Sequence, residues 1–204
     1  MTVTAVEPRK KSLSALYIDG EFAMKLDTQT LLENKITPGT ELDDEQLHEL
    51  VKKSDLRRAK EKALWLISYR DHSSKELYDK LRRDYSEDSA QAALERMQEL
   101  SLINDEAFAQ RYAKELSAKH QSPQNIRYKL LQKGIDKDLA DSIVEGLDID
   151  PEAEIEALVE KKYVQKLGDE KGLRRTVAAL QRAGYRYSDI KSVLSRYVED
   201  NDYD

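Results

Sequence analysis

The sequence predicts a mainly α-helical, elongated protein with about nine helices in three tandem three-helix repeats, preceded by a small N-terminal β-hairpin and helix segment. Three runs share one helical pattern at a spacing of roughly fifty residues: 75–88, 124–138 and 175–189. Leu81, Leu130 and Leu180 lie 49 and 50 positions apart within these runs. A fixed period with one helical unit per repeat is typical of repeat architectures, whose extended surfaces usually bind partners. The high share of charged residues, 36%, with only 7 glycines, suits soluble helices.

The N-terminal segment, residues 1–53, has a mixed pattern. We expect residues 1–13 to form a loose tail. The pair Asp19-Gly20 is a type I′ turn signal, and the apolar residues on both sides of it predict a two-stranded hairpin over 15–26. Two short helices are expected after the hairpin, at 28–34 and from Asp43 to about 53.

Helix-capping residues divide the rest of the chain. Ser73 opens a capping box, and Ser122-Pro123 places proline at a first helical position. Gly134 and Gly184 stand where helices should end in the left-handed conformation. The predicted helices are about 55–70, 74–83, 87–100, 105–118, 123–132, 137–146, 151–167, 170–182 and 188–198. Grouped in threes, they predict repeats at 54–104, 105–149 and 150–204, the last with an acidic tail.

Apolar residues at three- and four-residue spacing are expected to form the core of each repeat. In the first repeat these residues are Ala63, Leu64, Ile67, Leu77, Leu81, Leu94, Met97 and Leu100. Because about 45 residues bury only a small core, each repeat should depend on its neighbours for stability.

The sequence supports no catalytic or metal chemistry. It has no cysteine, which excludes disulfides, thiolate catalysis and cysteine-based zinc sites. His48, His72 and His120 lack metal-ligand spacing, and Asp71 beside His72 is expected to order a turn rather than to act as an acid–base pair. No phosphate-binding glycine loop and no GxSxG motif occurs. We therefore expect neither an enzyme nor a cofactor.

The same sequence predicts a cytoplasmic protein. No apolar run approaches the roughly 18 residues of a membrane span, and no signal-peptide core follows the first basic residues. The lack of cysteine is typical of a reducing compartment. We expect no membrane association.

Charge is distributed in bands along the chain. The net charge is −6, which argues against DNA phosphates as the main source of affinity. Residues 57–83 nevertheless hold nine Lys or Arg against four acids, and residues 171–196 hold seven against one. Residues 136–160 hold ten acids against one lysine. Such bands indicate either solvated helix faces or a surface matched to a charged partner.

Direct DNA binding is the alternative that these bands suggest. Three-helix units with basic second helices resemble helix-turn-helix modules. The third helices, which would then read the bases, are mostly acidic and would repel a duplex. The basic second helices therefore favour weak phosphate contact, or contact with an acidic protein surface, over base readout.

Three strings resemble the RecX family of regulatory proteins. The run LWLISYRDHSSKELYDKL, residues 64–81, is similar to the first-repeat signature of that family, whose core here is Arg70, Ser73, Glu76, Leu77, Lys80 and Leu81. The runs 101–113 and 122–135 are similar to the second and third landmarks. The matches cover about 55–150, and the weaker third repeat extends them to about 198. Tyr85 stands where glycine is usual, so that helix end is expected to close differently.

The resemblance implies a modulator of the RecA recombinase that acts in DNA recombination and repair. RecX-like proteins are built of three tandem three-helix repeats. They bind RecA and its nucleoprotein filament, lodge in the filament groove, and inhibit ATP hydrolysis and strand exchange. Some members also contact single- or double-stranded DNA directly. A monomer without cofactor is expected.

The expected partner-binding face consists of basic residues near corresponding helices of the three repeats. These residues are Arg70, Arg82, Arg83, Arg127, Lys129, Arg174, Arg175, Arg182 and Arg186. Each of them could instead be an ordinary solubilising charge, or a stem that covers apolar surface. The motif residues Ser73, Glu76, Leu77 and Leu81 are expected to be caps and core.

Two hypotheses of function follow. The first is a binding module that acts on a recombinase filament. The second is a helical repeat protein that affects recombination by binding DNA directly, which would require tight, strongly salt-dependent affinity for naked DNA.

Overall fold

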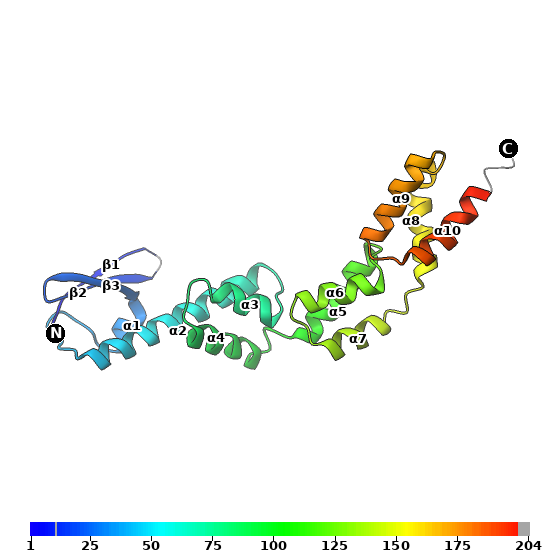
Figure 1. Cartoon of the computed structure of the whole chain (residues 1–204). Helices are drawn as coiled ribbons and strands as arrows, with labels where there is room; N and C mark the ends of the chain where they lie inside the picture. Colours follow the sequence, from blue (N-terminus) through cyan, green and yellow to red (C-terminus); the bar gives the residue numbers. More distant parts are fainter. Residues whose placement is uncertain (11, 200–204) are drawn as a thin grey trace. The chain divides into compact units, whose positions relative to one another are not determined.

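The computed structural model describes residues 1–10 and 12–199. In this part of the chain a three-stranded antiparallel sheet precedes ten α-helices and one 3-10 helix (Figure 1). The chain divides into two compact units, Met1–Asn104 and Asp105–Asp204. The predicted mainly helical class is therefore confirmed, whereas the finer division into repeats at 54–104, 105–149 and 150–204 stays a prediction.

The N-terminal sheet has the order β1-β2-β3, with β1 (Val3–Pro8), β2 (Leu13–Ile18) and β3 (Glu21–Asp27). Asp19 and Gly20 both have positive φ, 51° and 89°, as a type I′ turn requires. The expected loose tail over residues 1–13 is wrong, because β1 pairs along β2 from Val3 to Pro8. A two-stranded hairpin is marginal in water by itself, and this third strand enlarges the sheet.

Helix α1 (Thr28–Glu33) follows the sheet directly, and α2 (Asp44–Tyr69) then runs without a break. The prediction of two helices at 43–53 and 55–70 is wrong. Ser54, expected to separate them, is buried, and its Oγ accepts a hydrogen bond of 2.7 Å from the backbone N–H of Asp27. The serine hydroxyl thus joins α2 to the end of β3 instead of ending the helix.

One face of the sheet and the first half of α2 enclose a hydrophobic core. Its buried residues are Val3, Leu16, Leu26, Leu31, Ile36, Leu42 and Leu50. The Arg57 guanidinium of α2 forms an ion pair with the buried carboxylate of Asp27, with Nε and Oδ1 3.2 Å apart. The N-terminal segment is therefore packed against the same helix that enters the first repeat.

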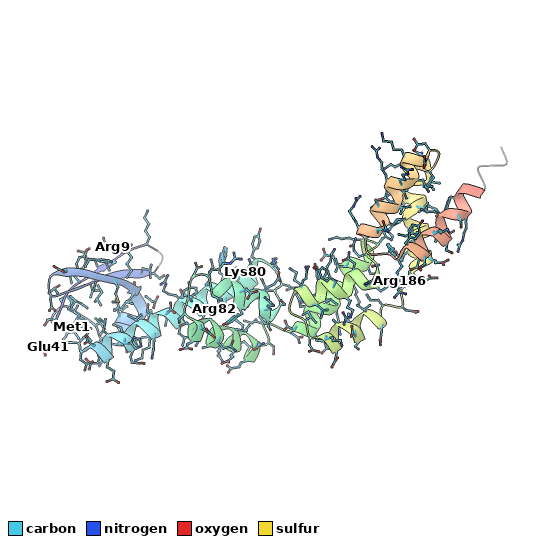
Figure 2. All side chains as sticks on the ribbon, viewed as in Figure 1. Met1, Arg9, Glu41, Lys80, Arg82 and Arg186 are labelled. Carbon is cyan, nitrogen blue, oxygen red and sulfur yellow. The ribbon has the colours of Figure 1, made fainter. Side chains whose placement is uncertain are left out.

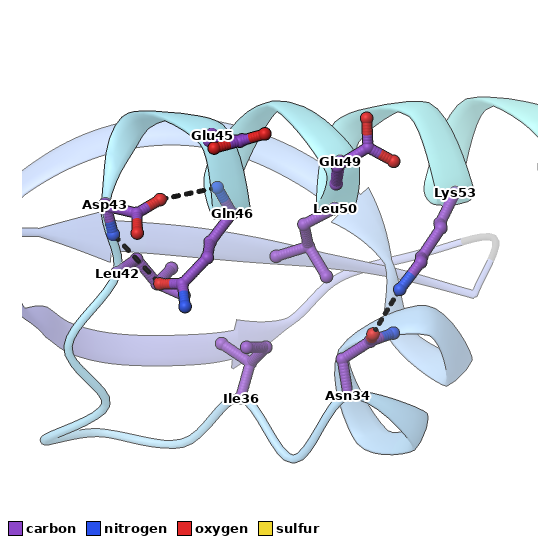
Figure 3. Close-up of a pocket in the computed structure, with 9 residues that line it drawn as sticks. All are labelled: Asn34, Ile36, Leu42, Asp43, Glu45, Gln46, Glu49, Leu50 and Lys53. Carbon is purple, nitrogen blue, oxygen red and sulfur yellow. Dashed lines mark hydrogen bonds between the residues drawn. The ribbon is translucent and has the colours of Figure 1, made fainter.

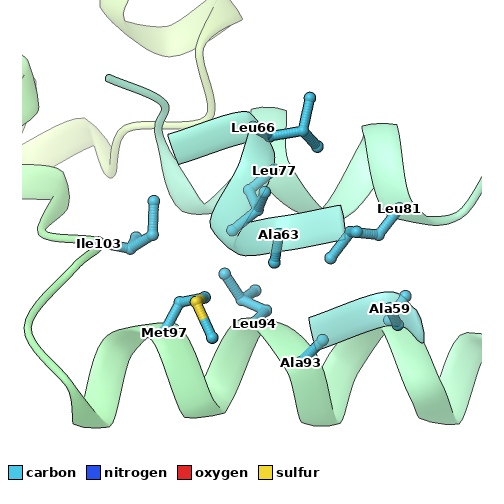
Figure 4. Close-up of a cluster of buried hydrophobic side chains, with 10 residues drawn as sticks. Ala59, Ala63, Leu66, Leu77, Leu81, Ala93, Leu94, Met97 and Ile103 are labelled. Carbon is cyan, nitrogen blue, oxygen red and sulfur yellow. The ribbon is translucent and has the colours of Figure 1, made fainter. Parts of the chain in front are cut away.

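The second half of α2 packs with α3 (Ser74–Leu81) and α4 (Glu87–Glu99) (Figure 4). The buried residues of this core are Ala59, Ala63, Leu66, Leu77, Leu81, Ala90, Ala93, Leu94, Met97 and Ile103. Leu64 and Leu100, expected in the core, are each 46% exposed. Leu66 takes the place expected for Leu64, because the core-facing side of α2 runs through Ala59, Ala63 and Leu66.

The second unit contains two further three-helix groups. The first consists of α5 (Asp105–Ala118), α6 (Pro123–Gln132) and α7 (Lys137–Glu145). The second consists of α8 (Pro151–Lys162), α9 (Glu170–Arg182) and α10 (Tyr187–Glu199), with the 3-10 helix η1 (Val164–Lys166) after α8. Each group has its own buried core, centred on Ile126 and Leu130 in one and on Ile155, Leu180 and Ile190 in the other.

Polar contacts join these two groups within the second unit. The N–H of Ser122 donates to the Ala183 carbonyl at 3.1 Å, and the Tyr185 hydroxyl donates to the His120 carbonyl at 3.0 Å. The ring Nδ1 of His120 lies 2.6 Å from a carboxylate oxygen of Glu154. Burial raises the pKa of the Tyr185 phenol, so it remains a hydrogen-bond donor at neutral pH.

The helix ends expected at Gly134 and Gly184 are confirmed, with φ of 78° and 90°. The different closure expected at Tyr85 is also confirmed. The Tyr85 N–H donates to the Leu81 carbonyl at 3.0 Å, and Tyr85 is not among the residues with positive φ. Its partly buried ring packs against the first-repeat core. The chain thus passes from α3 to Ser86, the N-cap residue of α4, without a residue in the left-handed conformation.

We predict that Gly184→Ala destabilises the second unit more than Gly39→Ala destabilises the first. Both glycines have φ near 90°, but a Cβ at Gly184 would lie 2.5 Å from Ser122 Oγ and 2.7 Å from Asn125 Cβ, whereas none lies within 4 Å at Gly39. The backbone penalty is roughly 1–2 kcal/mol in each case, and overpacking adds about 1–3 kcal/mol at Gly184. Urea unfolding followed by circular dichroism measures both losses, and equal losses would contradict the packing argument.

Candidate partner-binding surface

The first-repeat motif is a closed turn between α2 and α3. Arg70 follows the last residue of α2, and its guanidinium contacts the Glu76 carboxylate at 3.2 Å and the Asp71 carbonyl at 2.7 Å. The Ser73 hydroxyl caps α3 by accepting from the Glu76 N–H at 3.2 Å. Leu77 is fully buried below this turn. Arg70, predicted as a partner-binding residue, therefore holds the turn together through these contacts.

His72 is buried in the same turn, 4% exposed, with its Nδ1 2.8 Å from the Arg70 carbonyl oxygen. Burial lowers the pKa of its imidazole, because an apolar environment disfavours the charged ring. The nearby positive charges of Arg70 and Lys80 act in the same direction. A ring kept neutral and hydrogen-bonded to backbone orders the turn, as the sequence predicted.

The two remaining predicted residues of the first repeat differ in their contacts. Arg82 follows the last residue of α3 and is exposed, but its guanidinium donates to the Tyr85 carbonyl at 2.7 Å and helps to close the short turn (Figure 2). Arg83 is exposed at the next position. Of these two residues, Arg82 contributes a hydrogen bond to the turn, so Arg83 is the better candidate for contact with a partner.

In the second unit, α6 carries two predicted residues with local partners. Arg127 of α6 forms a two-point ion pair with Asp141 of α7, with one N–O distance of 3.2 Å. This hydrogen bonding lowers the pKa of the Asp141 carboxyl and raises the pKa of the Arg127 guanidinium. Lys129 Nζ donates to the side-chain oxygen of Gln121 at 3.2 Å. Both residues therefore contribute to packing within their helix group.

The predicted residues of the third repeat are the most exposed and the least engaged. Arg174 pairs with Glu170 at 2.5 Å, but both side chains are 76% exposed, so the pair adds little to stability. Arg175, Arg182 and Arg186 are exposed, and the described part of the second unit shows no ion pair for them. These guanidinium groups are available to an external anion.

A cationic cavity of about 270 Å³ lies beside Arg182 in the second unit. Lys119, Lys162, Arg182, His120 and Tyr163 contribute to its wall, and no carboxylate does. The three cations stand at or next to the C-terminal ends of α5, α8 and α9, where they also offset the helix dipoles. Lys119 and Lys162 are not among the predicted partner-binding residues, because their proximity to Arg182 depends on how the two helix groups pack.

In the first unit, a cavity of about 550 Å³ lies beside the start of α2 (Figure 3). Its apolar floor is formed by Ile36, Leu42 and Leu50. Its polar groups serve the fold: Asp43 and Gln46 form the capping box of α2, and Lys53 Nζ donates to Asn34 at 3.0 Å. Glu45 and Glu49 make the lining acidic, and it contains no serine, cysteine or histidine that could act as nucleophile or base.

The described residues contain no group of three or more histidine, aspartate or glutamate side chains that could hold a metal ion. Over residues 1–10 and 12–199, no helix is both long enough and apolar enough to cross a bilayer.

Comparisons with known proteins place this architecture in a family. Models of the first and second three-helix domains of RecX match residues 59–97 and 104–142. The regulatory protein RecX of Clostridium beijerinckii is 30% identical over 165 residues, which are 80% of this chain and 77% of that protein. The chain belongs to the RecX family. The regulatory protein RecX of Clostridium tetani is 28% identical over 97% of this chain and 94% of its own length.

Solved RecX structures share the fold. A crystal structure of regulatory protein RecX superposes with a TM-score of 0.63, at 21% identity, over 95% of this chain and 98% of that one. The crystal structure of RecX from Lactobacillus salivarius gives a TM-score of 0.57, at 26% identity, over 70% of this chain and 96% of its own. The resemblance to the RecX family seen in the sequence is confirmed.

We predict that burial of His72 makes the protein less stable in mild acid. Its pKa in the folded state lies below the ordinary value of 6.5, so the unfolded chain binds more protons as the pH falls. The loss of stability begins as the pH falls through about 6.5 and is complete below the folded-state pKa. His72→Gln should therefore show a smaller fall in the free energy of unfolding between about pH 7.5 and about pH 5.

The matched control for this prediction is His48→Gln, because His48 is exposed on α2. Urea unfolding at several pH values measures how steeply the free energy of unfolding falls with decreasing pH. An equally steep fall in the His72 variant and the unchanged protein would contradict the role of His72 in the loss of stability.

Proposed function

We propose that this protein regulates homologous recombination by binding a RecA-type recombinase and its nucleoprotein filament. Bound along the filament groove, it inhibits ATP hydrolysis and strand exchange. It works as a binding protein in the cytoplasm, without a catalytic site or cofactor of its own. The observation that carries the proposal is membership of the RecX family, with similarity to relatives named regulatory proteins over 97% and 80% of the chain.

The charge of the described surface supports binding to an anionic partner surface. Arg83 in the first unit and Arg175, Arg182 and Arg186 in the second are exposed cations on or just after corresponding helices. Arg182 offsets the dipole of α9, and no ion pair in the described part of the structure engages Arg83, Arg175 or Arg186. Acidic patches of a filament protomer, or the phosphates of the DNA within it, are suitable partners.

Repetition of the three-helix unit explains how weak contacts become effective. A filament repeats the same surface at every protomer, so a ligand with repeated modules can engage several equivalent sites. Linked modules raise the effective concentration of the second contact, and avidity then exceeds a single contact by roughly 10²–10⁴. A protein that spans neighbouring protomers would restrain the rearrangements coupled to nucleotide turnover.

Direct binding to naked DNA is the second candidate function. The cationic cavity beside Arg182 favours it, because Lys162 and Arg182 contribute to its wall together with Lys119, whose ammonium also lies 2.5 Å from the Glu115 carboxylate. The net charge of −6 and the acidic first turns of α4 and α7 oppose it. We therefore propose DNA contact as a weak addition to recombinase binding.

Titration into the DNA-dependent ATPase reaction of RecA tests the proposal. We expect inhibition at well below one molecule per RecA protomer, because one bound molecule would restrain several protomers. The measurement is the rate of phosphate release on single-stranded DNA. No inhibition up to an equimolar ratio would contradict the proposal, whereas tight binding to naked DNA at physiological salt would favour the second candidate.

A triple charge reversal on α9 tests the proposed face. Arg174→Glu, Arg175→Glu and Arg182→Glu together should raise the half-inhibitory concentration roughly tenfold, equivalent to about 1.4 kcal/mol. Helicity should be retained and the melting temperature should fall by only a few degrees, because all three side chains are exposed while the reversals remove the Arg174–Glu170 pair and place an acid at the C-terminal end of α9. The same reversal at Lys10, Lys25 and Lys52, three exposed cations outside the proposed face, serves as the matched control. Equal inhibition by both folded variants would rule out the α9 face.

A further inference from the structure

The outward face of α2 in the first repeat is apolar and exposed. Leu64 is 46%, Trp65 is 60% and Tyr69 is 83% exposed. Tyr69 lies one turn beyond Trp65, so these two side chains share one surface of the helix, and Leu64, the residue before Trp65, lies about 100° round the helix from it. We call Leu64, Trp65 and Tyr69 the aromatic face.

The fold does not need the aromatic face. The opposite side of α2 supplies the buried residues Ala59, Ala63 and Leu66, which close the first-repeat core without it (Figure 4). Trp65 is the only tryptophan in the chain. Single exposed apolar residues are common on soluble proteins, but Trp65 and Tyr69 share one surface with an exposed leucine beside it, and exposed apolar groups of this kind mark interaction sites.

Positive charge borders the aromatic face. Lys62 lies one turn before the Leu64–Trp65 pair, and its Nζ lies 4.6 Å from the centroid of the Trp65 ring. Glu61 lies four positions before Trp65 and borders the same surface, and the Arg57 guanidinium lies 3.8 Å from its carboxylate. Residues 57–83 hold nine Lys or Arg against four acids. An occupant of this face would therefore meet an apolar surface next to a net positive charge.

We propose that the aromatic face and Lys62 form a docking surface for an acidic segment of a protein partner. An apolar side chain of that segment packs on Trp65 and Leu64, and a carboxylate pairs with Lys62. Tryptophan and tyrosine are enriched among the residues that dominate protein interfaces. The proposal rests on the proposed function, because it takes the recombinase as the partner.

Two observations favour a protein segment over the bases of single-stranded DNA. Base stacking needs an open ring face, and the Lys62 ammonium lies over one face of the indole. Leu64 adds an aliphatic contact, which packs with apolar side chains and offers no stacking surface to a base. The aromatic face therefore combines features of a protein-binding surface.

The test compares Trp65→Ala, Tyr69→Ala and Lys62→Glu with Leu32→Ala, a control at a position of α1 that is 65% exposed. Affinity for RecA without DNA is measured by isothermal titration calorimetry, and affinity for a single-stranded oligonucleotide by fluorescence anisotropy. We expect Trp65→Ala to weaken RecA binding roughly 30-fold, as at an interface hot spot. Lys62→Glu should weaken it roughly tenfold, and Leu32→Ala less than about twofold.

Circular dichroism and thermal melting confirm that each variant is folded, and Trp65→Phe should retain most of the affinity. Unchanged RecA binding by folded Trp65→Ala, with binding by the original protein intact, overturns the docking surface and leaves the proposed function standing. No RecA binding by the original protein overturns both. Loss of oligonucleotide affinity alone in Trp65→Ala overturns the protein partner in favour of base stacking.

Discussion

The first unit depends on the continuity of α2. This single helix, Asp44–Tyr69, supplies buried side chains to two cores, Leu50 to the N-terminal core and Ala59, Ala63 and Leu66 to the first repeat. Neither core is large, so each gains stability from being attached to the other. Ser54 and Arg57 sit between the two stretches and bind Asp27, which fixes the sheet against the helix at the point where one core gives way to the next.

Many charges that look available in the sequence are used by the fold. Arg70 closes the α2–α3 turn, Arg82 closes the end of α3, and Arg127 joins α6 to α7. A guanidinium group can satisfy several backbone and carboxylate oxygens at once, which makes arginine effective at short turns between helices. The cations left exposed on and after α9, together with the aromatic face of α2, are better candidates for partner contact than the motif arginine.

Local signals predicted the elements well, and long-range contacts explain the failures. The caps at Asp43, Ser73 and Ser122 and the glycine turn at Gly184 were read from neighbouring residues, and the structure confirms them. The sequence does not indicate the first strand, because that strand is held by pairing with β2, whose partner residues run from Pro8↔Ser14 to Val3↔Ile18, and not by a pattern within residues 3–8. The apolar pattern of α2 allows either Leu64 or Leu66 to accompany Ala63 on the buried side of the helix. Only the packing against α3 and α4 shows that Leu66 is buried and Leu64 is exposed.

The sequence by itself determined the fold class, the family and most helix ends. These depend on interactions within a few residues: the period of apolar positions, the hydroxyl or carboxylate that caps a helix, and the glycine that admits positive φ. Tertiary structure decided which polar side chains are free to act. Ser54 could have ended a helix, and it joins two segments because β3 lies against α2. Lys119, Lys162 and Arg182 surround one cavity only because three helix ends converge. Hydrogen bonds and burial depend on distances in space, which one-dimensional spacing does not specify.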